Sequence, residues 1–271
     1  MKIITFWGGL GNQIFEYVYY TWLKEKYPNE KYYAYYPSVA LAAHNGLEID
    51  KRFDVALPET SILTNVIGKA LFNTSRIFRR LQLPLLFTCT QANGRHSAIF
   101  HCDYWQDKKY IPENFILNFK IEVLGTNNEG ILRIIEKEDS VAVHVRRGDY
   151  ITADNAATYG GICTEDYYAK ALDNVKKKVK KPRFIFFSDD PEYVMNTYNI
   201  PNMIIVDWNT GERSIFDMYL MSQCKHMVLA NSTFSYWAAR LNKNAISVWC
   251  PIKWTNINEP DIILETWNKI K

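Results

Sequence analysis

Two adjacent arginines, Arg146 and Arg147, follow an apolar run in the segment VAVHVRRGDY (141–150). Because side chains alternate along a strand, His144 and Arg146 share one face, and Arg147 points the other way. A guanidinium group binds phosphate oxygens through two parallel hydrogen bonds and remains charged at any relevant pH. The segment therefore predicts either a structural ion pair, with Asp149 as the partner, or a site for an anionic ligand.

A second polar cluster, NSTFS (231–235), follows another apolar run. Hydroxyl groups at the start of a helix present side-chain and backbone donors to an anion. A helix cap needs one such residue, whereas this stretch supplies an asparagine, two serines and a threonine. Combined with an arginine in the same cleft, the stretch predicts a diphosphate site.

The elements that must position these side chains alternate between strand and helix. β-branched and aromatic runs predict strands, and apolar residues at helical spacing predict helices. Strands are expected at 2–7, 30–37, 98–105, 140–146, 183–188, 202–207, 226–231 and 245–249. Helices are expected at 12–27, 61–81, from Thr164 to about 180, after Asp190, and at 213–223, 232–242 and 260–270. This order is typical of α/β folds built on doubly wound sheets.

The segment GTNNEG (125–130) is the most linker-like stretch of the chain. We therefore expect two Rossmann-like domains, 1–126 and 127–271, with the last helix packing back on the first domain. Ligands of doubly wound sheets bind beyond the carboxyl ends of the strands. Four polar clusters fall there, namely 8–13, 144–149, 188–190 and 231–233, and they predict a cleft between the two domains.

The glycine-rich turn at 8–13, GGLGNQ, is similar to a dinucleotide-binding fingerprint but lacks its third glycine. The second expected strand ends in Tyr35 and Tyr36, where such a fold needs an acidic residue for the ribose. These departures argue against a dehydrogenase.

The composition excludes several other classes. Hydrophobic residues make up 48% and charged residues 23% of the chain, which is typical of a globular protein. A net charge of +3 is too small for a protein that coats nucleic acid. The chain contains no D-x-D motif and no pair of histidines at ligand spacing, so we expect no bound metal. Five scattered cysteines without C-x-x-C spacing favour a reducing compartment.

Several segments together resemble one enzyme family, the α-1,2-fucosyltransferases of bacteria and animals. The similar segments are GGLGNQIFEY (8–17), HVRRGDY (144–150), YGGICTEDYY (159–168), FFSDD (186–190), DMYLMSQCKHMVLANSTFSYWAA (217–239) and WCPIKW (249–254). They occur in order and span nearly the whole chain. The resemblance implies a two-domain GT-B fold, GDP-fucose as the donor, no metal requirement and inversion at the anomeric carbon of fucose.

The resemblance also assigns roles to individual residues. It implies that Arg146 holds the β-phosphate and that Arg147 supports the motif, while Asn12 lies near the fucose and diphosphate. The expected donor site comprises Gly11, Asn12, Gln13, His144, Arg146, Arg147, Ser188, Asp189, Asp217, Asn231, Ser232, Thr233, Phe234 and Ser235.

The expected catalytic residues are Arg146, Asp149 and Asp154. Either carboxylate can accept the proton of the acceptor hydroxyl group. For Asp149, orientation of the arginines is an equally good interpretation.

The favoured hypothesis is an enzyme that moves fucose to the 2-hydroxyl group of a terminal galactoside. The alternatives are another GDP-sugar transferase, with a different linkage or donor, and a nucleotide-sugar-binding protein without catalysis. The expected acceptor is a galactose-terminated oligosaccharide or a lipid-linked glycan. No leader or membrane-spanning segment is evident, so we expect a cytoplasmic enzyme. Its basic stretches, KKKVKK (176–181) and Arg76, Arg79 and Arg80, permit peripheral contact with the inner membrane.

Overall fold

The computed structural model describes the backbone of residues 1–271 and every side chain except those of Asp149, Ile151, Ala153 and Asp154. The chain divides into two compact units, Met1–Lys120 and Ile121–Lys271. This division lies close to the boundary after residue 126 expected from the sequence. Each unit is an α/β unit with one parallel sheet, which confirms the predicted fold class of two Rossmann-like domains.

The N-terminal unit contains a four-stranded sheet of order β2-β1-β4-β3. Its strands are β1 (Lys2–Thr5), β2 (Tyr32–Tyr35), β3 (Thr88–Cys89) and β4 (Phe100–His101). Its helices are α1 (Leu10–Lys26), α2 (Ser38–Ala42), α3 (Ile49–Arg52), α4 (Ile62–Arg80) and the 3₁₀ helix η1 (Lys108–Tyr110). Gly68 of α4 lies directly against the ring of Tyr35, where a methyl group would collide with the ring. This glycine lets α4 approach the sheet closely.

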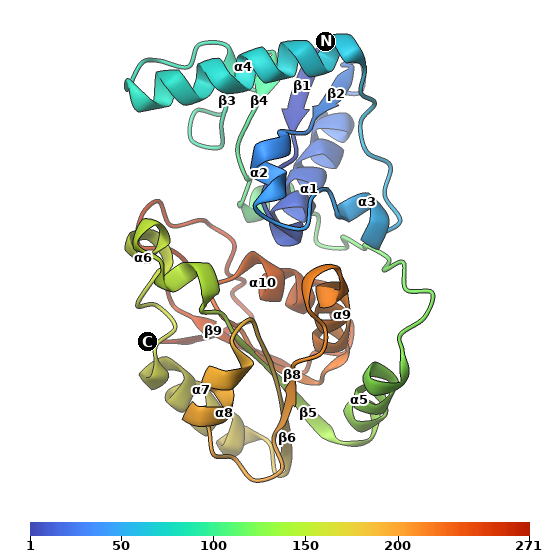
Figure 1. Ribbon diagram of the computed structural model, residues 1–271, viewed down its shortest axis with the longest axis vertical. Helices are drawn as coiled ribbons and strands as arrows, with labels where there is room; N and C mark the ends of the chain where they lie inside the picture. The colour runs from blue at the N-terminus through green and yellow to red at the C-terminus, as the bar shows by residue number, and fades with distance from the viewer. The chain divides into compact units, whose positions relative to one another are not determined.

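The C-terminal unit contains a six-stranded parallel sheet of order β10-β9-β8-β5-β6-β7. Its strands β5, β6, β8 and β9 are labelled in Figure 1. Its strands are β5 (Asp139–Val145), β6 (Pro182–Ser188), β7 (Ile204–Val206), β8 (His226–Val228), β9 (Ser247–Pro251) and β10 (Asn268–Ile270). Its helices are α5 (Thr126–Lys137), η2 (Gly148–Ile151), α6 (Ala153–Tyr159), α7 (Glu165–Lys178), α8 (Pro191–Thr197), η3 (Gly211–Ser214), α9 (Ile215–Gln223) and α10 (Thr233–Arg240).

Strand β5 shows the predicted alternation of side chains. Val141, Val143 and Val145 belong to the apolar core beneath α7 and α8. His144 and Arg146 therefore point to the opposite face of the sheet. On one side of β5 the sheet continues with β6 and β7, and on the other side it continues with β8, β9 and β10. The direction of strand addition therefore reverses between β5 and β8, which is the topological switch point. Arg146 follows β5, and the NSTFS segment follows β8. The switch point is where doubly wound sheets bind their ligands.

Two sequence predictions about the C-terminal unit are wrong. The expected linker, 125–130, contains the first turn of α5. Asn128 of this turn is buried and forms hydrogen bonds with Asn209 and Trp208, which hold the turn against the rest of the unit. The tail 260–270 forms no helix that could pack back on the first domain. Its last residues form β10, which extends the C-terminal sheet beside β9.

One strand prediction in the N-terminal unit is too long. The expected strand at 98–105 is reduced to Phe100–His101, since Trp105 adopts a left-handed conformation with φ of 57° that a strand excludes.

Candidate active site

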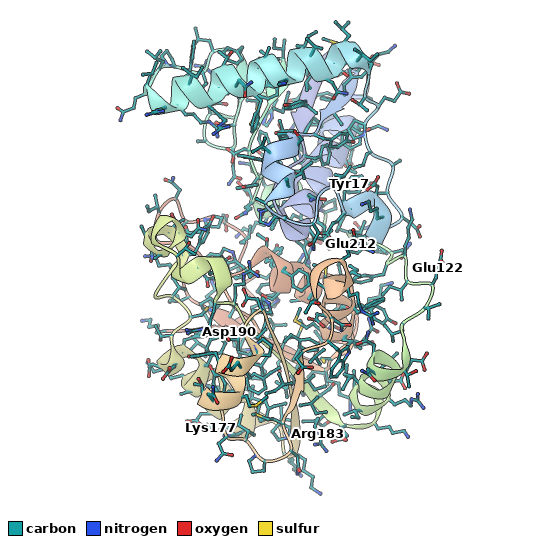
Figure 2. The ribbon with its side chains drawn as sticks, in the orientation of Figure 1. Tyr17, Glu122, Lys177, Arg183, Asp190 and Glu212 are labelled. Carbon is teal, nitrogen blue, oxygen red and sulfur yellow. The ribbon has the colours of Figure 1, made fainter. Side chains whose placement is uncertain are left out.

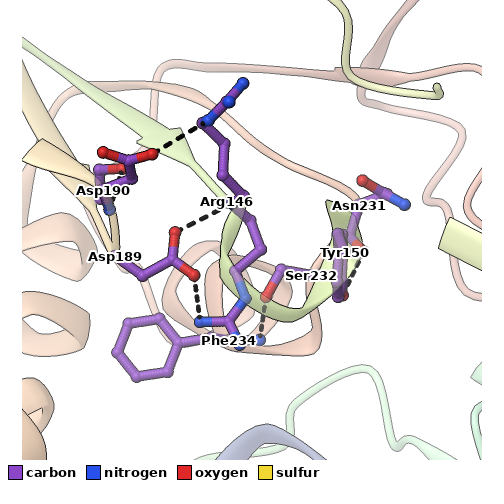
Figure 3. Close-up of polar contacts among 9 residues, drawn as sticks. Arg146, Tyr150, Asp189, Asp190, Asn231, Ser232 and Phe234 are labelled. Atoms are coloured by element: carbon purple, nitrogen blue, oxygen red, sulfur yellow. Dashed lines mark hydrogen bonds and ion pairs between the residues drawn. The ribbon is translucent and has the colours of Figure 1, made fainter. Parts of the chain in front are cut away.

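Both arginines of the HVRRGDY segment form ion pairs with the carboxylates that follow β6 (Figure 3). Nη1 of Arg146 lies 3.0 Å from Oδ2 of Asp189, and Nε of Arg147 lies 3.2 Å from Oδ2 of Asp190. The parallel pairing of β5 with β6 brings the ends of the two strands together. Asp149 is the ion-pair partner expected from the sequence, and its side chain lies outside the described residues.

Arg147 is anchored by an aromatic ring and by a helix-capping carboxylate. Its guanidinium group lies 3.6 Å from the centroid of the Tyr193 ring. Its partner Asp190 is itself fixed as the N-cap of α8, because Oδ1 of Asp190 accepts a hydrogen bond of 3.0 Å from the backbone N–H of Tyr193. The Arg146 guanidinium group points toward Asp189 and Ser232 (Figure 3), and it lies 5.6 Å from the centroid of the Tyr150 ring. The contacts of Arg147 with α8 suit a supporting role, and the position of Arg146 beside Ser232 suits ligand binding.

Gly148 is required by the close approach of Asp189. A Cβ atom at position 148 would collide with Oδ2 of Asp189. The other oxygen, Oδ1, accepts a hydrogen bond of 2.9 Å from the backbone N–H of Arg147. The carboxylate of Asp189 thus bridges the Arg146 side chain and the Arg147 backbone, and the glycine leaves room for it.

His144 is a buried, neutral imidazole on the same face as Arg146. Burial lowers the pKa of His144 to about 3, and the positive charge of Arg146 acts in the same direction. Its Nδ1 atom has no hydrogen-bond partner in the described part of the chain. The ring of Phe234, from α10, is tilted against it with 5.9 Å between ring centroids. His144 therefore offers an unused polar atom beside the arginine.

The NSTFS segment divides into ligand-facing and structural positions. Ser232 caps α10, and its hydroxyl oxygen accepts a hydrogen bond from the backbone N–H of Phe234. Asn231 is buried and donates to the carbonyl oxygens of Tyr159 and Trp254. The hydroxyl group of Ser235 is also buried, and it bonds to backbone carbonyl groups. Thr233 and Phe234 are the half-buried positions of the segment.

Asp217, in the first turn of α9, is a half-buried carboxylate with an unusual pKa. Burial raises the pKa of Asp217 to about 7, although a hydrogen bond of 2.8 Å from Nδ2 of Asn209 to its Oδ1 lowers it. Asn209 is fixed in turn by Asn128 of α5. Helix α9 packs against α10, so Asp217 belongs to the layer that carries Ser232.

A cavity of about 410 Å³ lies beside the two arginines within the C-terminal unit. Its walls include the rings of Tyr150, Tyr159 and Tyr193, and Tyr150 stacks on Tyr159 at 4.8 Å between centroids. Gly160, Gly161, Cys163, Thr164, Glu165, Asp166 and Asn231 complete the lining. Cationic groups combined with aromatic walls suit a phosphorylated sugar.

Most of this lining was not predicted from the sequence as site residues. The segment YGGICTEDYY (159–168) carried the resemblance to the family, yet it offered no residue type whose chemistry stands out. One available signal was its paired glycines after an aromatic residue, which indicate a tight backbone turn. Gly161 does adopt a left-handed conformation with φ of 70°.

The predicted residues of the N-terminal unit surround the turn that opens α1. Gly11 is buried, and Oδ1 of Asn12 accepts a hydrogen bond from Nε2 of Gln106. Gln13 is inaccessible to solvent, and its amide group donates to the carbonyl oxygens of Gly8 and Gly46. Its Oε1 atom accepts hydrogen bonds from two backbone N–H groups, those of residues 48 and 49. Gln13 is thereby committed to holding the turn.

Two predicted catalytic side chains, Asp149 and Asp154, lie outside the described residues. Ser188, another predicted donor contact, accepts a hydrogen bond of 3.0 Å from the backbone N–H of Asp190. Ser188 therefore shapes the turn that presents both ion-paired carboxylates.

One group of metal-ligating side chains comes together in the N-terminal unit, although their spacing in the sequence did not suggest it. Cys89, His96 and His101 place their ligand atoms within 4.8 Å of one another. The hydroxyl group of Tyr19 lies 2.9 Å from Nδ1 of each histidine, and Nε2 of His101 lies 3.1 Å from the carbonyl oxygen of Ala98. This hydrogen-bond network accounts for the cluster without an ion.

Comparison with known proteins gives one family. The model of glycosyl transferase family 11 matches residues 77–271. The O-antigen biosynthesis glycosyltransferase WbnK of Escherichia coli is 30% identical and is matched over 96% of this chain and 97% of its own length. An α-1,2-colitosyltransferase of Escherichia coli is 28% identical, with 97% of each protein covered.

Similarity over part of the chain extends to animals, and one solved structure shares the fold. The galactoside 2-α-L-fucosyltransferase SEC1 of Bos taurus is 33% identical over 60% of this chain and 52% of its own length. The glycosyl transferase family 9 structure from Veillonella parvula superposes with a TM-score of 0.52 at 10% identity, covering 92% of this chain and 80% of that one. This structural likeness concerns the fold alone.

Proposed function

The chain belongs to glycosyltransferase family 11, and we propose that it transfers L-fucose from GDP-fucose to the 2-hydroxyl group of a terminal galactoside. The proposal includes inversion at the anomeric carbon and no need for a divalent metal. One observation carries it: Arg146 lies at the switch point of the sheet with Ser232, and its partner is a carboxylate that a diphosphate can replace.

The interaction free energies favour replacement of Asp189 by a diphosphate on Arg146. The Arg146 and Asp189 side chains are 31% and 24% exposed, so their ion pair contributes about 1 kcal/mol or less to stability. A fixed cationic donor at a developing oxyanion is worth about 3–4 kcal/mol in the transition state. Exchanging Asp189 for the diphosphate therefore costs little compared with what the new contact contributes. The backbone N–H groups and dipole at the start of α10 add to the attraction for the anion.

The mechanism is a single displacement. The acceptor oxygen forms a bond to the anomeric carbon while the bond from that carbon to the β-phosphate oxygen breaks, and GDP leaves with the electron pair. Negative charge grows on the leaving diphosphate. Arg146 stabilises this charge more in the transition state than in the ground state, which accelerates the reaction. Arg147, fixed on Tyr193 and Asp190, keeps the turn rigid enough for this purpose.

The proposal gives the proton of the acceptor hydroxyl group to a carboxylate. Asp149 and Asp154 are the proposed bases, and Asp149 has orientation of the arginines as its alternative role. Loss of a base lowers kcat without weakening GDP binding, whereas loss of an orienting group weakens GDP binding. Asparagine variants at each position, assayed for both quantities, separate these roles.

Asp217 is the proposed reader of the guanine base. Guanine presents two neighbouring N–H donors, at N1 and at the 2-amino group, which match one carboxylate. Asn209 holds the Asp217 carboxylate in place through its hydrogen bond. Adenine lacks this pair of donors, so the carboxylate gives a physical basis for selecting GDP.

The second candidate function is transfer of colitose. It is favoured by similarity to an α-1,2-colitosyltransferase over 97% of both chains, whereas the fucosyltransferase of Bos taurus matches 60% of this chain. In either case we propose a glycan acceptor presented at the cytoplasmic face of a membrane, since the relative WbnK is an O-antigen biosynthesis enzyme.

A transfer assay with defined products tests the proposal. The purified protein is incubated in EDTA with lactose and, separately, GDP-fucose, GDP-colitose and GDP-mannose. We expect a fucosylated product whose NMR spectrum shows an α-linkage to the 2-hydroxyl group of galactose. A colitosylated product with no fucosylated one assigns the second function, and absence of transfer from every GDP-sugar contradicts both.

A further inference from the structure

The outer face of α4, together with the loop that follows it, exposes many apolar side chains. Ile62 is 87% exposed and Leu86 is 69% exposed. Leu63, Val66, Ile77, Leu81 and Leu83 are also exposed. Scattered exposed apolar residues are normal, but seven of them on one helix and the loop after it point to an interaction surface. We call Ile62–Leu86 the α4 surface.

The exposed apolar residues at the two ends of α4 share one stripe of the helix surface, which also carries Asn73 and Arg80. At about 100° per residue, Ile62, Val66 and Ile77 fall within about 60° of one another around the helix. Lys69 and Arg76 follow on one side of that stripe, within about 40° of Ile62. The opposite side of the helix, with Gly68 and Phe72, packs on the sheet. The exposed side chains therefore project outward from the unit (Figure 2).

The charge of this region has one sign. From Thr60 to Cys102 the sequence contains Lys69, Arg76, Arg79, Arg80 and Arg95 but no aspartate or glutamate. One of these cations, Arg79, is engaged with the backbone, since Nη2 donates to the carbonyl oxygen of Cys102 at 2.8 Å. Arg76 and Arg80 are exposed, close to the exposed leucines of the loop LQLPLL (81–86).

We propose that the α4 surface binds an anionic phospholipid bilayer, with α4 lying along the membrane and the 81–86 loop entering the headgroup boundary. Helices that lie in an interface combine an apolar stripe with basic residues at its edges, which matches α4. Leucines enter the acyl region while the arginines remain at the phosphate groups. No helix among the described residues combines the length and apolar composition needed to cross a bilayer. The proposal stands independently of the proposed activity.

Sedimentation with lipid vesicles tests this inference. The purified full chain is mixed with vesicles of phosphatidylcholine alone or of equal parts phosphatidylcholine and phosphatidylglycerol. We expect binding to the mixed vesicles that weakens as the salt concentration rises, because exposed charges are screened. The double variant Arg76→Gln, Arg80→Gln is expected to bind the mixed vesicles roughly 20- to 30-fold more weakly, at about 5-fold for each cation.

Two further variants make the test specific. Leu83→Asn with Leu86→Asn is expected to weaken binding at least about 10-fold, because both leucines lose their burial in lipid. The matched control is Lys176→Gln with Lys177→Gln, which removes the same charge from exposed positions on α7 (Lys177 is labelled in Figure 2). This control is expected to bind like the unmodified chain, and all three variants are expected to keep its circular dichroism spectrum.

Three results would overturn the proposal. One is no sedimentation with anionic vesicles at low salt. Another is equal weakening by the α7 control, because binding would then follow total charge and not the α4 surface. The third is a dimer in analytical ultracentrifugation that the leucine variant abolishes while vesicle binding stays unchanged, which would assign the surface to a second copy of the chain.

Discussion

The most informative perturbation of the donor site is Asp217→Asn, because it removes a charge while keeping the shape of the side chain. Burial raises the pKa of Asp217 to about 7. The carboxylate can accept both N–H groups of guanine only when it is ionised. GDP binding should therefore weaken as the pH falls through the neutral range, and this dependence should be absent from the variant.

The magnitude follows from the pKa and from the hydrogen bonds. With a pKa of about 7, the ionised fraction is about 0.09 at pH 6 and about 0.91 at pH 8, so affinity for GDP rises about 10-fold between them. At pH 8 the asparagine variant loses charge-assisted hydrogen bonds worth about 1.5–3 kcal/mol, which corresponds to about 10- to 150-fold weaker binding.

Calorimetric titration of GDP and ADP at pH 6, 7 and 8 measures both effects. A phosphate group also titrates near pH 6, so the variant serves as the control that removes this contribution. The unmodified chain should prefer GDP to ADP most strongly at pH 8, and the variant should lose much of that preference. An unchanged GDP preference in Asp217→Asn, or an equal pH dependence in both proteins, would refute the role of this carboxylate.

Three other predictions concern a glycine of the site, a buried carboxyl group and the independence of transfer from metal ions. Gly148→Ala should push the Asp189 carboxylate away from the backbone N–H of Arg147, shift the turn that carries Arg146, and so lower kcat at least about 10-fold with little change in melting temperature; an unchanged kcat would show that this close approach is dispensable. Burial raises the pKa of Glu16 well above its ordinary value of 4.5, so the folded chain holds this proton more tightly than the unfolded chain, and stability falls as the pH rises above about 4.5. Glu16→Gln should therefore raise the melting temperature at pH 8 more than at pH 4; an equal shift at both pH values would contradict this assignment. Finally, EDTA should leave the initial rate of transfer unchanged. A rate restored only by added Mg²⁺ or Mn²⁺ would show that the arginines alone do not stabilise the charge on the leaving diphosphate.

The strands and helices near the site were predictable because local signals and tertiary packing agree there. Thr164 and Asp190 cap α7 and α8 as their sequence context indicated. The last strand was not predictable, since its pairing with β9 is a long-range event that overrides the local helical pattern. The first turn of α5 depends in the same way on Asn128, whose hydrogen bonds reach residues about 80 positions away.

The candidate site shows the same division between local and long-range information. Residue type identified Arg146 and Arg147, and strand periodicity placed His144 on the face of Arg146. The strand ends placed residues 188–190 at the same edge of the sheet as Arg146, but the ion pairs of Asp189 and Asp190 depend on the pairing of β5 with β6, which brings residues more than 40 positions apart together. The tyrosine walls of the cavity were also beyond sequence reasoning, because the chain has 18 tyrosines and eight of them are buried in its core.

The measurement that tests the central claim most directly is titration of GDP, in EDTA, into the unmodified chain, Arg146→Gln and Arg147→Gln. The structure predicts a loss of about 10- to 150-fold in GDP affinity for Arg146→Gln, from charge-assisted hydrogen bonds worth about 1.5–3 kcal/mol, with a nearly unchanged melting temperature. Arg147→Gln should lower the melting temperature more, because it loses the contacts with Asp190 and Tyr193. Unchanged GDP binding by Arg146→Gln would contradict the claim and leave this arginine as one half of an ion pair with Asp189.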